Sequence, residues 1–172
     1  MRKPIAIVGS AVFFLVGPGV IVGLVPWLLT GWLVSQPVRY WVPMRVLGVI
    51  MIAAGLIVLI QAFVRFIVEG LGTPVPIAAP TRLVVGGVYR YVRNPMYVAG
   101  LWAIIGQALL LGQLSLLVYA AVVFLITAAF VRWYEEPSLA HQFGTDYEAY
   151  RRAVPAWWPR LRPIWRGRRT KS

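Results

Sequence analysis

The sequence predicts an all-α, multi-pass membrane protein that forms a single domain over residues 1–172 and crosses the bilayer about four times. Hydrophobic residues make up 60% of the chain and the mean hydropathy is +0.75, which is more apolar than ordinary soluble domains. A helix needs about 20 apolar residues to span a bilayer. Four segments approach or exceed that length and are predicted as the membrane helices, at about residues 5–29, 46–66, 96–111 and 114–131.

The first apolar segment follows Arg2 and Lys3, an arrangement also found in signal peptides. It is too long for a signal peptide and has no clear small-residue cleavage site, so we expect a retained helix. Gly17-Pro18-Gly19 lies inside it, and a proline at such a position predicts a kink. The second segment has the length and composition of one membrane crossing.

The third and fourth segments are separated by Gly112-Gln113, which leaves room only for a tight turn. They are therefore predicted to form an antiparallel helical hairpin. After the fourth segment, Pro137 suits the first turn of a helix and Gly144 suits a helix end. We expect two short cytoplasmic helices there, the second ending before Pro155.

The distribution of charge predicts the orientation of the chain. With both termini in the cytoplasm, 15 of the 17 basic residues lie inside and only Arg39 and Arg45 lie outside. All five acids also fall on the inner side. We therefore expect a bacterial-type plasma membrane protein whose working face is cytoplasmic, formed by residues 81–97 and 132–159.

Composition also limits the chemistry. The absence of cysteine excludes disulfides, thiol catalysis and cysteine-ligated metals. One histidine and five acids are few ligands, so we expect no metal site. The net charge of +12 is compatible with nucleic acid, but in so apolar a chain it indicates anionic lipid headgroups instead. The basic tail that contains Trp157, Trp158 and Trp165 is predicted to lie at the lipid interface, without nucleic acid as a partner.

Two polar clusters flank the predicted hairpin. Asn94-Pro95 begins the third segment, where proline presets the first turn and asparagine can cap it, leaving backbone N–H groups for an anion. Glu135-Glu136 follows the fourth segment, and acids there need a partner. That partner is either an arginine or a cationic ligand group. S-adenosylmethionine has a suitable ammonium, carboxylate and sulfonium, although these residues alone do not single it out.

The two clusters belong to longer motifs. The first contains Gly87-Val88-Tyr89, Arg93-Asn94-Pro95-Met96-Tyr97 and Gly100. The second contains Glu135-Glu136, Leu139, Phe143-Gly144, Tyr147, Tyr150 and Val154-Pro155. In order and spacing they resemble the motifs of the membrane-embedded methyltransferases that include isoprenylcysteine carboxyl methyltransferases and phospholipid N-methyltransferases. The resemblance covers about Thr81 to Pro159, and the N-terminal half is similar only in consisting of membrane helices.

The resemblance implies a site for S-adenosyl-L-methionine. It implies that Glu135 holds the ammonium and that Arg132 lies near a substrate-binding arginine. We predict Arg132 and Glu136 as the catalytic residues, since Glu136 could accept the proton that an amine acceptor must lose. The other implied cofactor-binding residues are Thr81, Arg82, Leu83, Val84, Tyr89, Asn94, Pro95, Met96 and Tyr97. Asn94 stands where the carboxyl methyltransferases usually have histidine. This difference leaves the identity of the methyl acceptor open, but not that of the cofactor.

The resulting hypothesis is an enzyme that transfers a methyl group from S-adenosylmethionine to a lipophilic acceptor taken from the bilayer, in the manner of an isoprenylcysteine carboxyl O-methyltransferase. The alternatives are a phospholipid N-methyltransferase, a nicotinamide-dependent membrane reductase and a non-enzymatic membrane scaffold. The chain has no G-x-G-x-x-G after a strand, so it is not a soluble methyltransferase of the Rossmann type.

Overall fold

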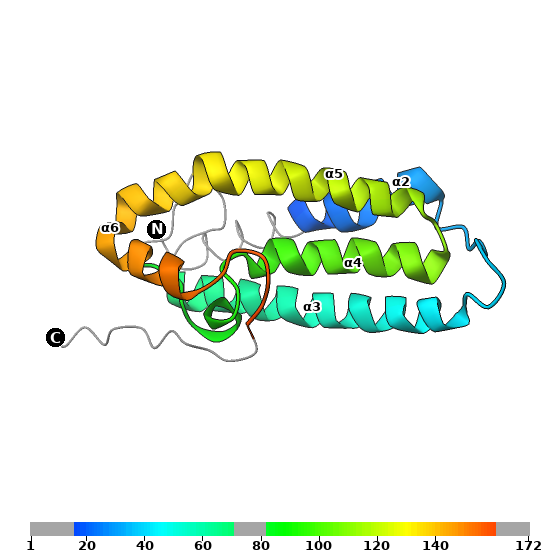
Figure 1. Cartoon of the computed structure of the whole chain (residues 1–172), viewed down its shortest axis with the longest axis horizontal. Helices are drawn as coiled ribbons and strands as arrows, with labels where there is room; N and C mark the ends of the chain where they lie inside the picture. The colour runs from blue at the N-terminus through cyan, green and yellow to red at the C-terminus, as the bar shows by residue number, and fades with distance from the viewer. Residues whose placement is uncertain (1–15, 71–81, 161–172) are drawn as a thin grey trace.

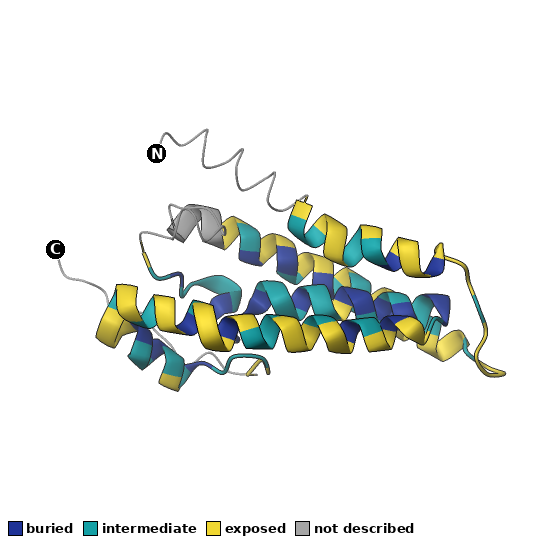
Figure 2. Ribbon diagram, turned by 90° about the horizontal axis from the view of Figure 1, so that it is seen from above, coloured by how far each residue is buried: buried dark blue, intermediate teal, exposed yellow. Residues whose placement is uncertain are grey.

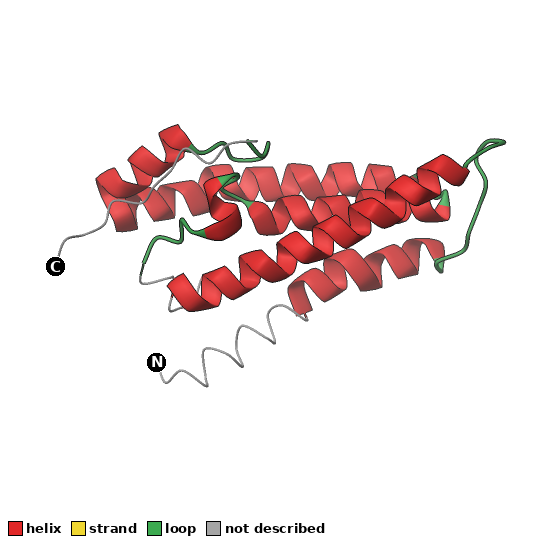
Figure 3. Ribbon diagram, turned by 90° about the horizontal axis from the view of Figure 1, so that it is seen from below, coloured by secondary structure: helices red, strands yellow, loops and turns green. Residues whose placement is uncertain are grey.

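The computed structural model describes residues 16–70 and 82–160, and every regular element in those ranges is a helix (Figure 1; Figure 3). The predicted all-α class is confirmed for this part of the chain. In order, the elements are the π-helix η1 (Gly19–Leu24), α2 (Val25–Thr30), α3 (Val42–Gly70), the 3-10 helix η3 (Gly87–Arg90), α4 (Pro95–Leu111), α5 (Ser115–Phe130), the π-helix η4 (Val131–Glu135) and α6 (Glu136–Ala153).

Helix α4 lies at the centre of the bundle, packed against α3, α5 and η1 (Figure 2). The closest contact joins α3 to α4 through small residues. A Cβ atom on Gly106 would lie 2.8 Å from the backbone oxygen of Gly48, and one on Gly48 would lie 2.6 Å from the oxygen of Gly106. Membrane helices commonly pack in this way, because small residues let two backbones approach closely.

The first helix runs from Val16 to Thr30 within the described range. Where the sequence predicts a kink at Gly17-Pro18-Gly19, the structure has a π-helical segment that begins at Gly19 and continues into α2. A π-helix places one extra residue in its turn and so leaves some carbonyl groups without their usual donors. The helix ends at Gly31, which has the left-handed conformation.

Helices α5, η4 and the first half of α6 form one continuous helix up to Gly144, where the chain bends before the second half of α6 (Figure 1). Gly144 has φ 51° and ψ −126°, a conformation outside the helical region that glycine adopts without steric cost. The predicted end of a helix at Gly144 is therefore confirmed. The chain does not break before Pro137, which occupies the first turn of α6. The bend folds the second half of α6 back toward the start of α4.

Within residues 16–70 and 82–160, two helices are long and apolar enough to cross a membrane, α3 over Val42–Arg65 and the long helix that starts at Ser115. In the latter, α5 carries no charged residue, whereas Arg132, Glu135 and the charged side chains of α6 lie beyond it. The outer faces of the bundle expose large apolar side chains, including Ile50, Ile57 and Ile60 of α3 (Figure 2). Exposure of so large an apolar surface to water would be unfavourable, whereas contact with lipid would not, so this surface suits a bilayer.

Residues 31–41 close the end of the bundle opposite α6 (Figure 1). The hydroxyl of Ser35 donates to the carbonyl of Gly112 at 2.6 Å, and the indole of Trp41 donates to the carbonyl of Leu109 at 2.7 Å. These bonds attach the loop to the C-terminal end of α4, whose last carbonyl groups have no donor within the helix. Three residues, 112–114, then connect α4 to α5.

Candidate functional site

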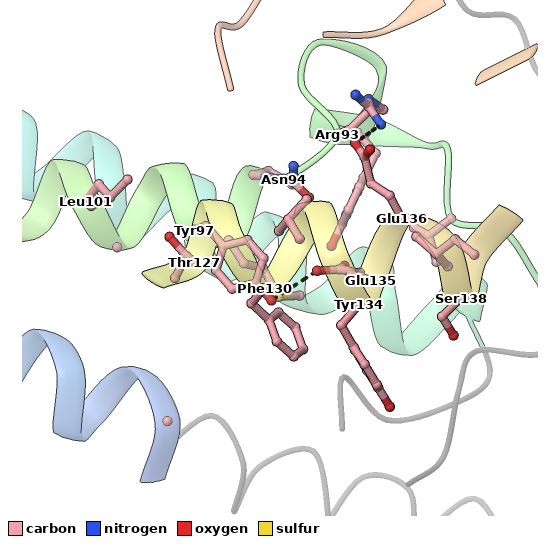
Figure 4. A pocket seen from close by; sticks show the side chains of 18 of the residues that line it. Arg93, Asn94, Tyr97, Leu101, Thr127, Phe130, Tyr134, Glu135, Glu136 and Ser138 are labelled. Atoms are coloured by element: carbon pink, nitrogen blue, oxygen red, sulfur yellow. Dashed lines mark hydrogen bonds and ion pairs between the residues drawn. The ribbon is translucent and has the colours of Figure 1, made fainter. Parts of the chain in front are cut away.

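A cavity of about 510 Å³ lies where the folded-back α6 meets the start of α4. Its walls come from the first helix, α3, residues 83–97, α4, α5, η4 and α6 (Figure 4). Binding sites for small molecules typically have volumes of about 300–1,000 Å³. One end of the cavity is polar, with Arg93, Asn94, Glu135, Glu136 and Gln142, and the remaining walls are largely apolar.

Glu136 is buried, and both oxygens of its carboxylate form ion pairs with arginines. Its carboxylate accepts a hydrogen bond from Arg93 at 2.7 Å and lies 3.7 Å from Arg151. Arg93 and Glu136 are only 11% and 10% exposed at their side chains. Arg93 also donates through Nε to the carbonyl of Val154 at 2.9 Å, and through Nη1 to the hydroxyl of Tyr147 at 3.2 Å. This network ties the start of α4 to both halves of α6.

Glu135 has a different environment, although it is the adjacent residue. Its carboxylate accepts one hydrogen bond, from the hydroxyl of Tyr97 at 3.2 Å, and points into the cavity (Figure 4). Among the described residues, no basic side chain lies within salt-bridge distance of it. Glu135 lies beyond the apolar helix α5, and burial raises the pKa of its carboxyl above the usual value, partly offset by the hydrogen bond from Tyr97. A cation in the cavity would relieve this burial cost.

The start of α4 faces the same cavity. Pro95 occupies the first helical position, and Pro95, Met96 and Tyr97 line the cavity. The predicted cap by Asn94 is wrong: its side chain makes no capping bond and donates to the carbonyl of Ala156 at 3.2 Å. The N-terminus of α4 therefore lacks a side-chain cap, and such helix starts attract carboxylates and phosphates.

The segment that follows α6 holds this arrangement in place. The backbone N–H groups of Arg93 and Asn94 donate to the carbonyls of Pro155 and Ala156 at 2.9 and 3.3 Å. Trp157 then packs against the ring of Tyr97, with the ring centroids 6.3 Å apart. Tyr97 is thus supported on one side by an aromatic ring while its hydroxyl reaches Glu135.

The wall before α4 comes from residues 83–89. Val84 and Tyr89 pack with Ala62 of α3, whereas Leu83 packs against the cluster that contains Tyr147 and Tyr150. The hydroxyl of Tyr150 donates to the carbonyl of Tyr89 at 2.7 Å. Residues 82–85 form neither helix nor strand, and the 3-10 helix η3 begins at Gly87.

The structure brings most of the predicted site residues together. Those that line the cavity are Leu83, Val84, Tyr89, Asn94, Pro95, Met96, Tyr97, Glu135 and Glu136. Arg82 and Arg132 do not line it, and the side chain of Arg132 is 67% exposed, 3.9 Å from Glu136. Thr81 lies outside the described residues. A substrate-binding role for Arg132 thus stays a prediction that this cavity does not support.

Two features of the cavity were not among the predicted site residues. Arg93 belongs to the first motif but was not assigned to the site, yet it lines the cavity and its side chain hydrogen-bonds to three residues. The first helix contributes Gly17, Pro18, Ile21 and Val22 to the apolar walls. The only sequence signal for the latter was the Gly-Pro-Gly interruption, which by itself indicates no site.

Comparison with known proteins defines the class. Residues 43–146 match the family described as phospholipid methyltransferase, so the chain belongs to this family. The more particular similarity is to the protein-S-isoprenylcysteine O-methyltransferase of Schizosaccharomyces pombe, with 39% identity over 75 residues. That match covers 43% of this chain and 31% of the relative, so the chain aligns with less than a third of the relative's length. No solved structure matches the chain.

Proposed function

We propose that this protein transfers a methyl group from S-adenosylmethionine to a lipophilic acceptor at the cytoplasmic face of the membrane, in the manner of an isoprenylcysteine carboxyl O-methyltransferase. One observation carries the proposal. Of two adjacent acids at the cavity, Glu136 is paired with arginines, whereas Glu135 faces the cavity and has, among the described residues, only a tyrosine hydroxyl as its partner. A cationic ligand group would stabilise the charged form of a buried carboxylate in such a position.

The residues of the cavity fit the three polar groups of S-adenosylmethionine. Glu135 would hold the ammonium, the uncapped N-terminus of α4 would hold the carboxylate, and the ring of Tyr97 offers a face to the sulfonium. When bound, S-adenosylmethionine supplies an electrophilic methyl group. The chain's own contribution is to align the two reactants and exclude water, since methyl displacement needs orientation more than acid–base catalysis.

The acceptor would occupy the apolar part of the cavity, between the first helix, α4 and α5. Ile21, Leu101, Val123 and Phe130 line this part, and none of them can pair with a polar group. A carboxylate acceptor needs no proton acceptor, whereas an ammonium must first lose a proton. Because Glu136 is engaged by Arg93, it is poorly placed to receive that proton, which favours O-methylation over N-methylation.

We place four crossings in the membrane, with both termini in the cytoplasm and anionic headgroups around the cytoplasmic end. Trp133 and Trp158 support this placement, since both are large, strongly exposed aromatic side chains near α6. Tryptophan is enriched at the boundary between headgroups and hydrocarbon. Arg132 directly precedes Trp133 and Arg160 follows Trp158 by two residues, so both arginines can meet lipid phosphates.

The test is calorimetric binding of S-adenosylmethionine to the detergent-purified protein and to Glu135→Gln. We expect saturable binding by the wild type that weakens about ten- to a hundredfold in the variant, the size of a lost charged hydrogen bond. Glu148→Gln is the matched control, because Glu148 also lies near the end of the bundle but pairs with Arg151 and does not line the cavity.

If the folded wild type does not bind S-adenosylmethionine in detergent or in lipid vesicles, the methyltransferase proposal is rejected. The result would then favour the alternatives, a membrane reductase or a non-enzymatic scaffold. If binding occurs, transfer of labelled methyl from S-adenosylmethionine distinguishes the acceptors. Methylation of an N-acetyl prenylcysteine supports the carboxyl O-methyltransferase, and methylation of phosphatidylethanolamine in vesicles supports the N-methyltransferase instead.

A further inference from the structure

The first helix borders the cavity through its π-helical segment. Ile21 and Val22 belong to η1 and line the apolar walls, together with Gly17 and Pro18 just before it. This helix precedes residue 43, where the family match begins. The wall that it provides therefore lies outside the part of the chain that defines the family.

Pro26 explains why this segment needs support from other helices. In η1 the N–H of Val25 donates to the carbonyl of Val20, five residues back. With the same spacing, the residue at position 26 would donate its backbone N–H to the carbonyl of Ile21, and with α-helical spacing to that of Val22. Pro26 has no N–H, so it donates to neither carbonyl.

Two side chains from the neighbouring helices supply donors for these carbonyls. The hydroxyl of Tyr119 on α5 donates to the carbonyl of Ile21 at 2.8 Å, and the amide of Gln107 on α4 donates to that of Val22 at 2.8 Å. Backbone groups in a membrane interior must be satisfied within the protein. Gln107 and Tyr119 are thus bound to the backbone of a cavity wall, and neither lines the cavity itself.

We propose that the π-helical segment Gly19–Leu24 is the wall that selects the apolar chain of the acceptor, and that Gln107 and Tyr119 are positioning residues that fix its distance from α4 and α5. The proposal rests on the proposed methyltransferase function and identifies the element that determines its substrate specificity. Gly100 of α4 faces the same wall, with its Cβ position 3.7 Å from a methyl group of Val22. A shift of η1 would therefore change the width of the cavity directly.

The kinetic test compares wild type with Gln107→Leu and Tyr119→Phe, each of which removes one donor to η1. The acceptors are N-acetylcysteine derivatives with geranyl, farnesyl or geranylgeranyl chains. Interhelical hydrogen bonds in membranes are modest, so we expect KM for the preferred acceptor to rise about three- to tenfold, with a weaker preference among chain lengths. Affinity for S-adenosylmethionine should stay within about twofold, because Glu135 and Tyr97 are untouched.

Trp41→Phe is the matched control, since it too removes one side-chain donor to a helix carbonyl, in this case that of Leu109 on α4, at the opposite end of the bundle. It should leave KM and the chain-length preference unchanged. The proposal is overturned if Gln107→Leu and Tyr119→Phe keep the wild-type KM and preference, or if they weaken cofactor binding as strongly as acceptor binding.

A second measurement needs neither cofactor nor acceptor, so it separates failure of this inference from failure of the proposed function. The chain has no cysteine, which allows spin labels at Leu24→Cys on the first helix and Val118→Cys on α5, both exposed positions. We expect a narrow distance distribution that broadens or shifts in Gln107→Leu and Tyr119→Phe but not in Trp41→Phe. An unchanged distribution would show that the two side chains do not hold the wall.

Discussion

The side chains of the adjacent residues Glu135 and Glu136 point in different directions because a helix turns about 100° per residue. Glu136 points toward Arg93 and the folded-back half of α6, whereas Glu135 points toward Tyr97 and the cavity (Figure 4). The first arrangement is structural, because it satisfies two buried charges mutually. The second leaves a carboxylate without a salt bridge within the described residues, which is why the proposed cofactor contact falls on Glu135.

This division of roles predicts the effect of Glu136→Gln. The substitution leaves the buried guanidinium of Arg93 without its closest counter-charge, and removing one partner of a buried ion pair costs about 3 kcal/mol or more. We expect a clear fall in the thermal unfolding midpoint in detergent. Glu135→Gln should change that midpoint little while it weakens cofactor binding. A stable Glu136→Gln protein that has lost only turnover would show that Glu136 is a catalytic residue instead.

The sequence predicted a role for both acids, Glu135 in cofactor binding and Glu136 in catalysis. The structure adds that the two side chains have different surroundings, which is the basis for proposing Glu135 as the cofactor contact. A helical wheel drawn from α5 would misplace both, because the π-helix η4 ends at Glu135 and shifts the register that the wheel assumes. The resemblance to known motifs supplied the assignment that periodicity could not. The same limit applies to Arg132, which belongs to the motif region but whose side chain turns outward.

At the scale of elements, helix boundaries were predictable and helix packing was not. The third and fourth apolar segments, 96–111 and 114–131, agree with α4 and α5 to within one residue at each end. Helix α3 is longer than its apolar segment, 46–66, at both ends. It continues past the charged residues Arg45 and Glu69, which do not mark its ends. Helices that are apolar on every side carry no amphipathic stripe to indicate which face meets which neighbour.

Glycine positions illustrate the difference and give a prediction. Gly100 belongs to the first motif, but the tight contact with α3 forms at Gly106, where an added Cβ would meet the backbone of Gly48 at 2.8 Å. Gly106→Leu should separate α3 from α4 and destabilise the fold by about 1–3 kcal/mol, as overpacking does. Thermal unfolding in detergent measures this. Gly23→Ala is the control, since its Cβ meets nothing within 4 Å; equal losses in both variants would contradict the packing argument.

At the scale of the whole molecule, the bundle separates two polar ends. One end carries α6, the cavity and the ion-pair network, and the other carries the loop 31–41 with Arg39 (Figure 1). Between residues 41 and 131 the chain runs along the bundle three times, in α3, α4 and α5. In the topology that we propose, all three of these helices cross the membrane, so the loop and α6 lie on opposite sides of it. The excess of basic residues favours the cytoplasmic side for α6.

Accessibility of single cysteines tests this topology, because the chain has no native cysteine that would react. Gln36→Cys in the loop and His141→Cys in α6 both replace exposed residues that do not line the cavity. A membrane-impermeant maleimide added to intact cells should label Gln36→Cys at once and His141→Cys only after the membrane is permeabilised. The reverse pattern would invert the orientation and place the cavity away from cytoplasmic S-adenosylmethionine. Labelling of both positions from one side would mean that α3, α4 and α5 do not all cross the bilayer, and the proposed acceptor entry from lipid would fail with them.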